Sequence, residues 1–377
     1  MNFSNIGVEI KQKLIGVVGD NYCLTEKNSI EDYCHDETED LNFPPQLVVK
    51  PANTNEVSEI MKLASEYNIP VTPCGARTGL SGGALCVHGG IALSMERFNK
   101  IIKIDEDNLQ VITQSGVITQ ELQEAVLEKG LYYAPDPSSR GTCFIGGNIA
   151  ENAGGPRAVK YGVTKDFVLN LEVVLPNGEV IETGANTLKN STGYNLTQLM
   201  VGSEGTLGIV TQATLKLIPC PKHNMLMLVP FTSAEKACEA VASIFKAGIT
   251  PSAMEFMERD AIQWTMDFTK ESPVKLKDNE QAHLLIEVDG NDTEVLFKEC
   301  EVIAAVVEEL DCGEIMFAET EAQKDALWFL RRRVAEAVKA TSIYKEEDTV
   351  VPRYNLPKLL KGVKAIGNKY GFKSICY

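Results

Sequence analysis

The spacing of hydrophobic residues in the first half of the chain alternates between the periods of a strand and of a helix. Residues 46–50 form an apolar run typical of a buried strand. Apolar positions within 57–64 recur at helical spacing after the cap residues Asn53 and Thr54. A short strand is predicted at 69–72. The same order of strand, helix and strand recurs more loosely at residues 109–115, 119–129 and 131–134.

A hairpin is predicted further along this half. Residues 168–175 and 179–183 have the apolar pattern of strands, and Asn177 with Gly178 between them is a dipeptide favoured in tight hairpin turns. Strands and helices alternate irregularly over this half of the sequence. The pattern therefore favours an α+β fold rather than a doubly wound parallel sheet.

Two prolines, Pro219 and Pro221, mark a predicted domain boundary, because proline interrupts helices and strands alike. Beyond them the pattern predicts two consecutive β-α-β units, which indicate a ferredoxin-like antiparallel sheet with its helices on one face. The predicted strands are 225–230, 251–257, 283–288 and 314–318, and the predicted helices are 292–310, 321–340, one from Lys358, and one from a capping box at Thr232–Glu235 to Lys246.

Three segments of the first half are rich in glycine and other small residues: 73–84, 135–155 and 202–211. Four glycines within residues 75–83 would let backbone N–H groups point together at a phosphate, with no Cβ in the way. The spacing is not the dinucleotide fingerprint G-x-G-x-x-G, and no Walker lysine follows. On composition alone, an extended ligand and a set of tight turns in a large α+β fold explain these segments equally well.

Composition and charge narrow the class of protein. The 377 residues suffice for two domains, and the net charge of −16 argues against a nucleic-acid partner. No apolar run is long enough to span a bilayer, and the first residues lack the features of a signal peptide, so a cytoplasmic location is expected. Ten scattered cysteines without a C-x-x-C pair argue against zinc, iron–sulfur clusters and a disulfide framework; buried free thiols are expected.

Taken together, the glycine-rich segments resemble those of FAD-linked oxidases and dehydrogenases of the vanillyl-alcohol oxidase type. The resemblance is closest to the D-lactate, glycolate and D-2-hydroxyglutarate dehydrogenase branch. The matching strings are PCGARTGLSGG at 73–83, PDPS at 135–138, IGGNIAENAGG at 145–155, KYGVTKD at 160–166, GYNL at 193–196 and GSEGTLG at 202–208. The resemblance implies a PCMH-type FAD-binding domain at 1–221, with its core at about 42–221, followed by a ferredoxin-like antiparallel-sheet cap domain at 222–377.

The resemblance also implies where FAD would lie. The loop at 75–83 would wrap the pyrophosphate, and the segments at 135–138 and 146–155 would line the isoalloxazine and ribityl part. Glu204, Gly208 and Ile209 would lie near the adenine end. The implied cofactor-binding residues are Pro73, Gly75, Ala76, Arg77, Thr78, Gly79, Leu80, Ser81, Pro135, Asp136, Ser138, Gly146, Gly147, Asn148, Ala150, Glu151, Asn152, Gly154, Gly155, Tyr161, Gly162, Glu204, Gly208 and Ile209. The alternative for Glu204, less favoured, is a role as a capping or ion-pair residue.

Flavin attachment is predicted to be non-covalent. Family members with covalent flavin commonly present a histidine in the pyrophosphate loop, and residues 75–83 contain none.

Oxidation of a 2-hydroxy acid requires a cation that holds the substrate carboxylate. By resemblance, Arg331 takes this role, because a guanidinium pairs bidentately with a carboxylate, and Lys345 is a second candidate. A solvated basic helix face and an ordinary surface lysine are the alternatives. The polar position that the family places four residues after the arginine is Ala335 here, which favours D-lactate over a dicarboxylate.

The family's G-H-x-G-D-G-N-x-H motif, whose histidines form the metal and proton-abstraction site, would begin just after Tyr377, where this chain ends. The expectation is therefore an incomplete cap, with a divalent metal bound only in a longer form of the chain and no metal ligands among these residues.

Several functions stay open on this basis. The first is FAD-dependent oxidation of a D-2-hydroxy acid of the D-lactate or glycolate type, with electrons passed to a protein or quinone acceptor. The others are a non-catalytic FAD-binding fragment or subunit of a larger complex, and an alkylglycerone-phosphate-synthase-like flavoprotein. The expected partners are a small 2-hydroxy acid and an electron-transfer protein.

Overall fold

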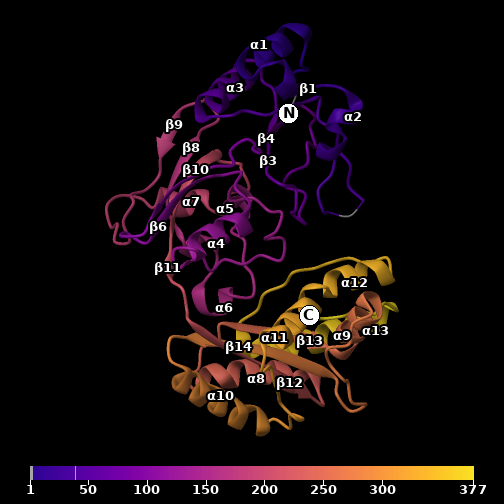
Figure 1. The fold of residues 1–377 in the computed structure, drawn as a ribbon. Helices are drawn as coiled ribbons and strands as arrows, with labels where there is room; N and C mark the ends of the chain where they lie inside the picture. The colour runs from indigo at the N-terminus through magenta and orange to yellow at the C-terminus, as the bar shows by residue number, and fades with distance from the viewer. Residues whose placement is uncertain (1–2, 39) are drawn as a thin grey trace. The chain divides into compact units, whose positions relative to one another are not determined.

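The computed structural model describes residues 3–38 and 40–377 and divides the chain into two compact units. The first unit comprises Met1–Gly155 and Gly162–Cys220, and the second comprises Pro156–Tyr161 and Pro221–Tyr377 (Figure 1). The chain therefore enters the second unit for six residues, returns to the first, and enters the second again after Cys220.

A mainly parallel sheet begins the first unit. Its strands are β1 (Cys23–Leu24), β2 (Leu47–Val49), β4 (Ile91–Ser94) and β3 (Val71–Cys74), in that spatial order, and only β1 is antiparallel to its neighbour. Helices α1 (Val8–Val18) and α3 (Thr54–Glu66) pack their apolar faces into the same core. The predicted cap of α3 is confirmed, since the side chain of Asn53 accepts a hydrogen bond from the Glu56 amide at 3.0 Å.

An antiparallel sheet of five strands follows, in the order β5 (Ile101–Asp105), β6 (Gln110–Gln114), β10 (Ile209–Lys216), β8 (Val168–Val174) and β9 (Val180–Glu182). The predicted hairpin is confirmed: β8 pairs with β9, and Gly178 turns the chain with φ +83°. The remaining elements of this unit are α2 (Lys27–Ile30), α4 (Thr119–Leu127), β7 (Leu131–Tyr132), α5 (Ile145–Glu151), α7 (Leu196–Met200) and β11 (Ile218–Pro219).

The second unit is built on an antiparallel sheet in the order β13 (Ala253–Glu258), β14 (Ala282–Gly290), β12 (His223–Phe231) and β15 (Met316–Phe317). Numbered along the chain, the four strands lie in the spatial order 2-3-1-4, which is the ferredoxin-like arrangement that the sequence predicts. The other elements of the unit are α6 (Ala158–Tyr161), α8 (Ala234–Lys246), α9 (Arg259–Thr269), α10 (Thr293–Glu308), α11 (Glu321–Arg332), α12 (Val334–Thr341) and α13 (Leu356–Tyr370).

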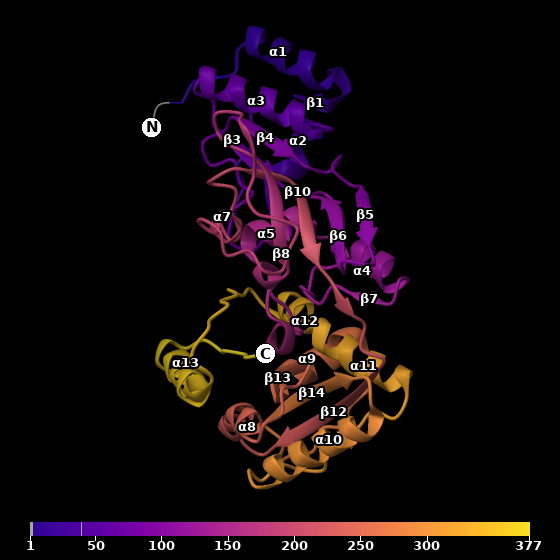
Figure 2. The same cartoon turned by 90° about the vertical axis from the view of Figure 1, so that its left-hand side faces the viewer.

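The prediction that helices cover one face of this sheet is wrong. Side chains of α8 and α10 pack on one face, and side chains of α9, α11 and α12 pack on the other. Figure 2 shows the ribbons of α10 and α11 on opposite sides of the sheet. Both faces of β12 and β14 carry apolar side chains, so both faces need cover from water.

Two predicted helix boundaries also need correction. Helix α8 is capped by Ser233 rather than Thr232, because the Ser233 hydroxyl accepts from the Lys236 amide at 3.4 Å. The single helix predicted at 321–340 is interrupted at Arg333, whose ψ of 0° ends α11 and begins α12. All ten cysteines are free thiols in the part of the chain that the structure describes, and seven of them are buried. Within residues 3–38 and 40–377, no helix has the length and apolar character needed to cross a membrane.

A buried histidine makes the second unit sensitive to acid. His283 of β14 is 1% exposed and lies 3.4 Å from a Glu280 carboxylate oxygen. Burial lowers the pKa of His283 below its usual value, although the negative charge of Glu280 opposes the shift. The folded state therefore keeps His283 neutral at pH values where the unfolded chain binds a proton.

We predict that the free energy of unfolding falls by about 1–2 kcal/mol between pH 7 and pH 5 because of this one residue. Both tryptophans, Trp264 and Trp328, belong to the second unit, so urea unfolding followed by tryptophan emission at the two pH values measures it. His283→Gln should remove this part of the pH dependence, whereas His223→Gln, at an exposed histidine of β12, should leave it unchanged. An equal slope for His283→Gln and wild type would contradict the prediction.

Candidate functional site

The three glycine-rich segments converge within the first unit. A Cβ on Gly75 would lie 3.8 Å from the Cα of Gly147, so the loop after β3 and helix α5 face each other across bare backbone. A Cβ on Gly205 would lie only 2.5 Å from the ring of Pro73, which places the third segment against β3. Segments far apart in the sequence are thus brought together at positions where glycine leaves the backbone bare.

Close packing explains two further glycines. A Cβ on Gly155 would overlap the carbonyl group of Asp136, so the segments at 135–138 and 146–155 touch through their backbones. A Cβ on Gly146 would lie 2.6 Å from the Cβ of Ser115. These two glycines are therefore explained by the fold itself, without a ligand.

Gly147 and Gly79 differ from those positions because a Cβ at either one would meet no atom within 4 Å. Open space lies beside bare backbone at both residues. A Cβ would fill that space, so the geometry fits a flat or extended ligand lying against the chain. This is the observation by which the residues present fit the flavin cofactor that the sequence predicts.

The turn at 202–204 caps the carboxyl end of α5. The amide of Gly202 donates to the carbonyl of Ile149 at 2.9 Å, and the amide of Glu204 donates to the carbonyl of Ala150 at 3.0 Å. Asn152 ends the helix in the left-handed region with φ +51° and accepts from the Lys165 amide at 2.9 Å. The turn therefore carries Glu204 to the end of α5 that bears Glu151.

Carboxylates gather beside the glycine loop. A Cβ on Gly83 would lie 3.1 Å from Glu151 and 3.6 Å from Glu204. Burial raises the pKa of Glu151, and the nearby charges of Glu204 and Asp36 raise it further. Such a lining of hydrogen-bond acceptors suits the hydroxyl and amino groups of a nucleoside better than a phosphate.

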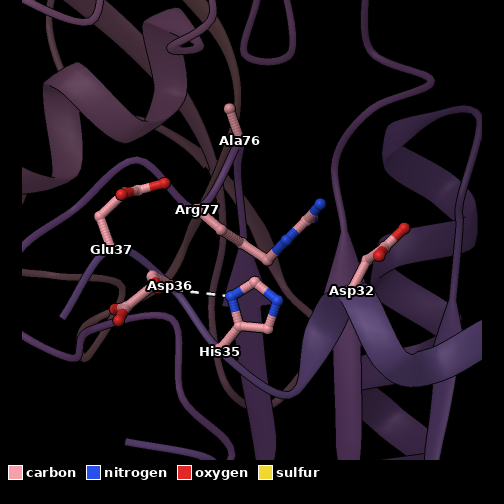
Figure 3. Close-up of a pocket in the computed structure, with 6 residues that line it drawn as sticks. All are labelled: Asp32, His35, Asp36, Glu37, Ala76 and Arg77. Carbon is pink, nitrogen blue, oxygen red and sulfur yellow. Dashed lines mark hydrogen bonds between the residues drawn. The ribbon is translucent and has the colours of Figure 1, made fainter. Parts of the chain in front are cut away.

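A pocket of about 210 Å³ lies next to the glycine loop, as Figure 3 shows. Asp36 is 7% exposed; one carboxylate oxygen accepts from the Thr38 amide at 2.9 Å, and the other has no hydrogen-bond partner among the residues that the structure describes. Sequence reasoning predicted Ala76 and Arg77 but missed the lining residues within 32–37, because no motif marks that segment. The pocket is lined by Asp32, His35, Asp36, Glu37, Ala76 and Arg77.

Several predicted cofactor residues make contacts that support the fold. The buried amide of Asn148 donates to the Thr119 hydroxyl at 2.6 Å. Asp136 pairs with Arg140 at 3.3 Å, and the carbonyl of Pro135 accepts from Gln123 at 2.9 Å.

The remaining predicted residues differ in their surroundings. Leu80, near the tip of the loop, is 52% exposed. Gly208 precedes β10, where a Cβ would lie 2.6 Å from Val173, and Ile209 begins that strand in the core. The hydroxyl of Tyr161 donates to Asp289 at 2.8 Å within the second unit.

The predicted substrate-binding residues lie in the second unit. Arg331 of α11 forms an ion pair at 2.7 Å with Glu255 of β13, and its guanidinium carbon lies 5.4 Å from the ring centre of Tyr377. The Nε of Arg331 is buried and has no hydrogen-bond partner among the described residues. Lys345 is exposed, in the segment after α12. Sequence reasoning did not foresee Glu255, because a charge partner on another element leaves no local signal.

Comparison with known proteins identifies the family. The family model of the FAD binding domain matches residues 45–184, and that of the FAD linked oxidases, C-terminal domain, matches residues 220–377. The chain is 40% identical to the glycolate oxidase subunit GlcD of Bacillus subtilis, over 98% of this chain and 77% of that protein. It belongs to the FAD-linked oxidase family.

Other members are similar over most of this chain. The D-lactate dehydrogenase of Anaerostipes hadrus is 40% identical, over 91% of this chain and 73% of that protein. The D-2-hydroxyglutarate dehydrogenase of Xanthomonas citri is 33% identical, over 86% of this chain and 68% of that protein. The predicted family is therefore confirmed, and the chain is an FAD-dependent enzyme of this group.

Solved structures support the fold. An alkyldihydroxyacetonephosphate synthase matches with a TM-score of 0.78 at 20% identity, over 98% of this chain and 76% of that one. A 4-ethylphenol oxidase from Gulosibacter chungangensis matches with a TM-score of 0.76 at 17% identity, over 100% of this chain and 81% of that one. The predicted α+β fold, a PCMH-type FAD-binding domain with a sheet cap domain, is confirmed.

We predict that Gly147→Ala weakens FAD binding by roughly tenfold or more, because its methyl group would occupy the open space beside α5. Unfolding of the apoprotein should be unchanged, since the methyl group would meet no protein atom within 4 Å. FAD affinity is measured by the quenching of flavin fluorescence on titration of the apoprotein.

Gly362→Ala is the matched control, because Gly362 also lies in a helix and a Cβ there also meets nothing within 4 Å. It should retain FAD fully. Equal FAD affinity of Gly147→Ala and Gly362→Ala would show that the cofactor does not lie against α5.

Proposed function

We propose that this chain oxidises a D-2-hydroxy acid of the D-lactate or glycolate type to the 2-oxo acid. The observation that carries the proposal is an arginine whose buried Nε has no hydrogen-bond partner among the described residues, in a C-terminal domain whose relatives are named glycolate oxidase subunit and D-lactate dehydrogenase. FAD, when bound, would supply the hydride acceptor at its N5 atom. The protein contributes binding, orientation and exclusion of water.

Arg331 is the proposed anchor of the substrate carboxylate. Glu255 holds one Nη group at 2.7 Å and so fixes the plane of the guanidinium, while the buried Nε has no acceptor in residues 3–38 and 40–377. A buried donor without a partner costs roughly 1–3 kcal/mol, and a substrate carboxylate would remove this cost. Ala335, four residues on, provides no polar group for a second carboxylate, and Lys345 is exposed. A small monocarboxylate fits this arrangement best.

We place the cofactor along the three converging segments of the first unit. The loop at 75–83 would face the pyrophosphate, and the segments at 135–138 and 146–155 would face the isoalloxazine and ribityl groups. Glu204, with Gly208 and Ile209, would lie near the adenine end. Residues 1–221 and 222–377 serve in this proposal as the FAD-binding and substrate domains.

The electron acceptor is proposed to be a protein or a quinone, and a cytoplasmic location stays a prediction of the sequence. A second candidate function is that of an FAD-binding subunit within a larger complex. It is supported by the name of the Bacillus subtilis relative, which describes that protein as a subunit.

Non-covalent flavin is the first prediction from this proposal. Precipitation of the purified holoprotein with acid should release all of the FAD into the supernatant, because the loop at 75–83 offers no histidine for attachment. Absorbance of pellet and supernatant near the flavin maximum measures the partition. Flavin that stays in the pellet after washing would contradict it.

The proposal predicts, against the expectation of an incomplete cap, that anaerobic addition of excess D-lactate bleaches the oxidised-flavin absorption band of the holoprotein. Arg331→Lys should slow this bleaching by about a hundredfold or more at a fixed D-lactate concentration, because a lysine lacks the planar fork that can hold Glu255 with an Nη group and orient a carboxylate with Nε. The rate is measured by stopped-flow absorbance.

Arg333→Lys is the matched control two residues away, since Arg333 follows the last residue of α11 and pairs with Glu336 of α12. It should reduce flavin at the wild-type rate. A flavin band that dithionite bleaches and D-lactate leaves unchanged would overturn the proposed reaction. Equal bleaching rates for Arg331→Lys and Arg333→Lys would show that Arg331 is not the anchor of the substrate carboxylate.

A further inference from the structure

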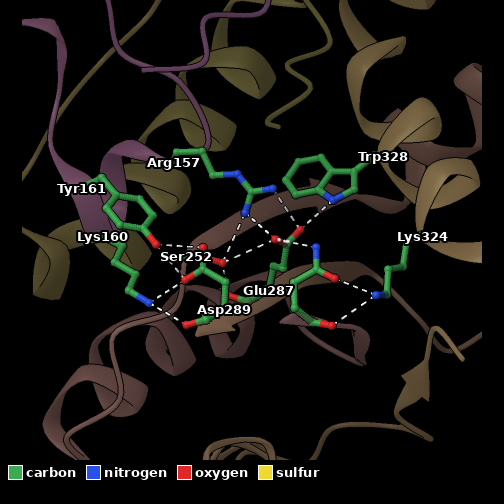
Figure 4. Close-up of polar contacts among 9 residues, drawn as sticks. Arg157, Lys160, Tyr161, Ser252, Glu287, Asp289, Lys324 and Trp328 are labelled. Carbon is green, nitrogen blue, oxygen red and sulfur yellow. Dashed lines mark hydrogen bonds and ion pairs between the residues drawn. The ribbon is translucent and has the colours of Figure 1, made fainter. Parts of the chain in front are cut away.

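Helix α11, which carries Arg331, rests on a buried polar network that the proposed reaction does not use. Figure 4 shows Glu287 at its centre, between Arg157 and Trp328. The carboxylate belongs to β14, and the residue is 1% exposed. A buried carboxylate is costly unless it is fully paired, so its partners indicate what its position serves.

The Glu287 carboxylate contacts residues from four different segments of the chain. Arg157 of the 156–161 segment forms a bidentate pair with it, the second contact being 3.2 Å between Nη2 and Oε2. The indole N–H of Trp328 on α11 donates to Oε2 at 2.8 Å. The hydroxyl of Ser252 lies 3.5 Å from Oε1, and the amide of Asn224 lies 3.4 Å from it.

The sheet register explains how Glu287 reaches the helix that bears Arg331. Glu287 pairs with Ala253 of β13, and Glu255 lies two residues further along β13, so both carboxylates point to the same face of the sheet. Trp328 and Arg331 are three residues apart on α11 and lie on one side of it. Two donors of the helix thus meet two carboxylates on adjacent strands.

A third contact extends this arrangement by one helical turn. Lys324 lies four residues before Trp328, and its ammonium donates to the Asn224 side chain at 2.6 Å and to the Asn224 carbonyl at 3.1 Å. Helix α11 therefore crosses β12, β14 and β13 in turn, bonded to each strand by one residue of a single face. Apolar packing alone would let a helix slide along its groove, whereas directed polar bonds define its position along its own axis.

We propose that Glu287 is a positioning residue for Arg331. Its hydrogen bond with Trp328 fixes the position of α11 along the helix axis. At that position the Nε of Arg331 faces a substrate carboxylate. Through Arg157, Glu287 ties that helix to the short segment that directly follows Gly155 in the chain. This inference rests on the proposed function of Arg331, and it assigns Glu287 no contact with substrate.

Two variants separate positioning from general stability. Trp328→Phe removes the N–H donor and keeps an aromatic ring, and Glu287→Gln removes the charge and keeps the shape. Each should raise the KM for D-lactate about tenfold or more, with FAD content and the dithionite-reducible flavin band unchanged. Since Glu287→Gln removes the charge with which Arg157 pairs and can impair folding, Trp328→Phe provides the second, less disruptive test.

Two matched controls lie in the same unit. Trp264→Phe alters the second tryptophan, on α9, and Glu258→Gln alters another buried carboxylate of the sheet, which pairs with Lys364 at 2.6 Å. Neither contacts α11 through a bond in the described structure. Both should keep the wild-type KM. If a control and its matched variant raise KM equally, or if neither does, Glu287 has only a structural role and the inference is overturned.

A binding measurement keeps the inference separate from the proposed reaction. In a Trp264→Phe background, Trp328 is the only tryptophan and its emission reports its own surroundings. Titration with D-lactate should change this emission, and Glu287→Gln should weaken the apparent affinity about tenfold. If D-lactate binds without bleaching the flavin, the proposed reaction is rejected. The ratio of the apparent D-lactate affinities with and without Glu287→Gln would still test the role of Glu287. An emission that does not respond to D-lactate would contradict both.

Discussion

Contact between backbones at positions without a side chain is the constraint on which the first unit depends. The carbonyl of Asp136 occupies the place of a Cβ on Gly155, and the ring of Pro73 occupies that of a Cβ on Gly205. These contacts draw three segments of a long sequence into one region. Because glycine gives up more conformational freedom on folding than any other residue, such a concentration is costly, and the surrounding sheets must compensate for it. What results is bare backbone beside open space at Gly79 and Gly147, which suits an extended cofactor.

The second unit uses a different device, in which buried carboxylates on a sheet organise a helix. Glu255 and Glu287 lie on adjacent strands of one face, and α11 presents Arg331 and Trp328 to them at one turn's spacing. Replacing buried charged groups by hydrophobic residues often leaves the free energy of unfolding unchanged. Their contribution here is to orient the side chains of α11 rather than to stabilise the fold. A guanidinium that is to hold a small carboxylate needs that orientation. The same sheet therefore serves both as a scaffold for packing and as an electrostatic template.

Much of the fold followed from local patterns. The cap of α3 at Asn53, the Asn-Gly hairpin and the order of strands in the second unit were all predicted, because each depends on residues within a few positions of one another. The failures have equally specific reasons. Ser233 replaces Thr232 as a cap because either hydroxyl satisfies the same sequence rule, and the break at Arg333 within a continuous helical pattern reflects packing of α12 against α9. The prediction of helices on one face of the second sheet failed because α9 and α11 pack on the other face, and local sequence does not specify which face a helix covers.

For the candidate site, the sequence alone determined which segments carry the chemistry: the glycine-rich strings, their order, and an arginine suited to a carboxylate. Only the tertiary structure decided what these groups meet. Asp36 beside the glycine loop, Glu255 against Arg331 and Glu287 against Arg157 each join residues far apart in the chain. A motif records the conformational needs of adjacent residues, which short-range sterics impose. The partner of a buried charge is set by sheet register and helix packing, and these depend on the whole fold.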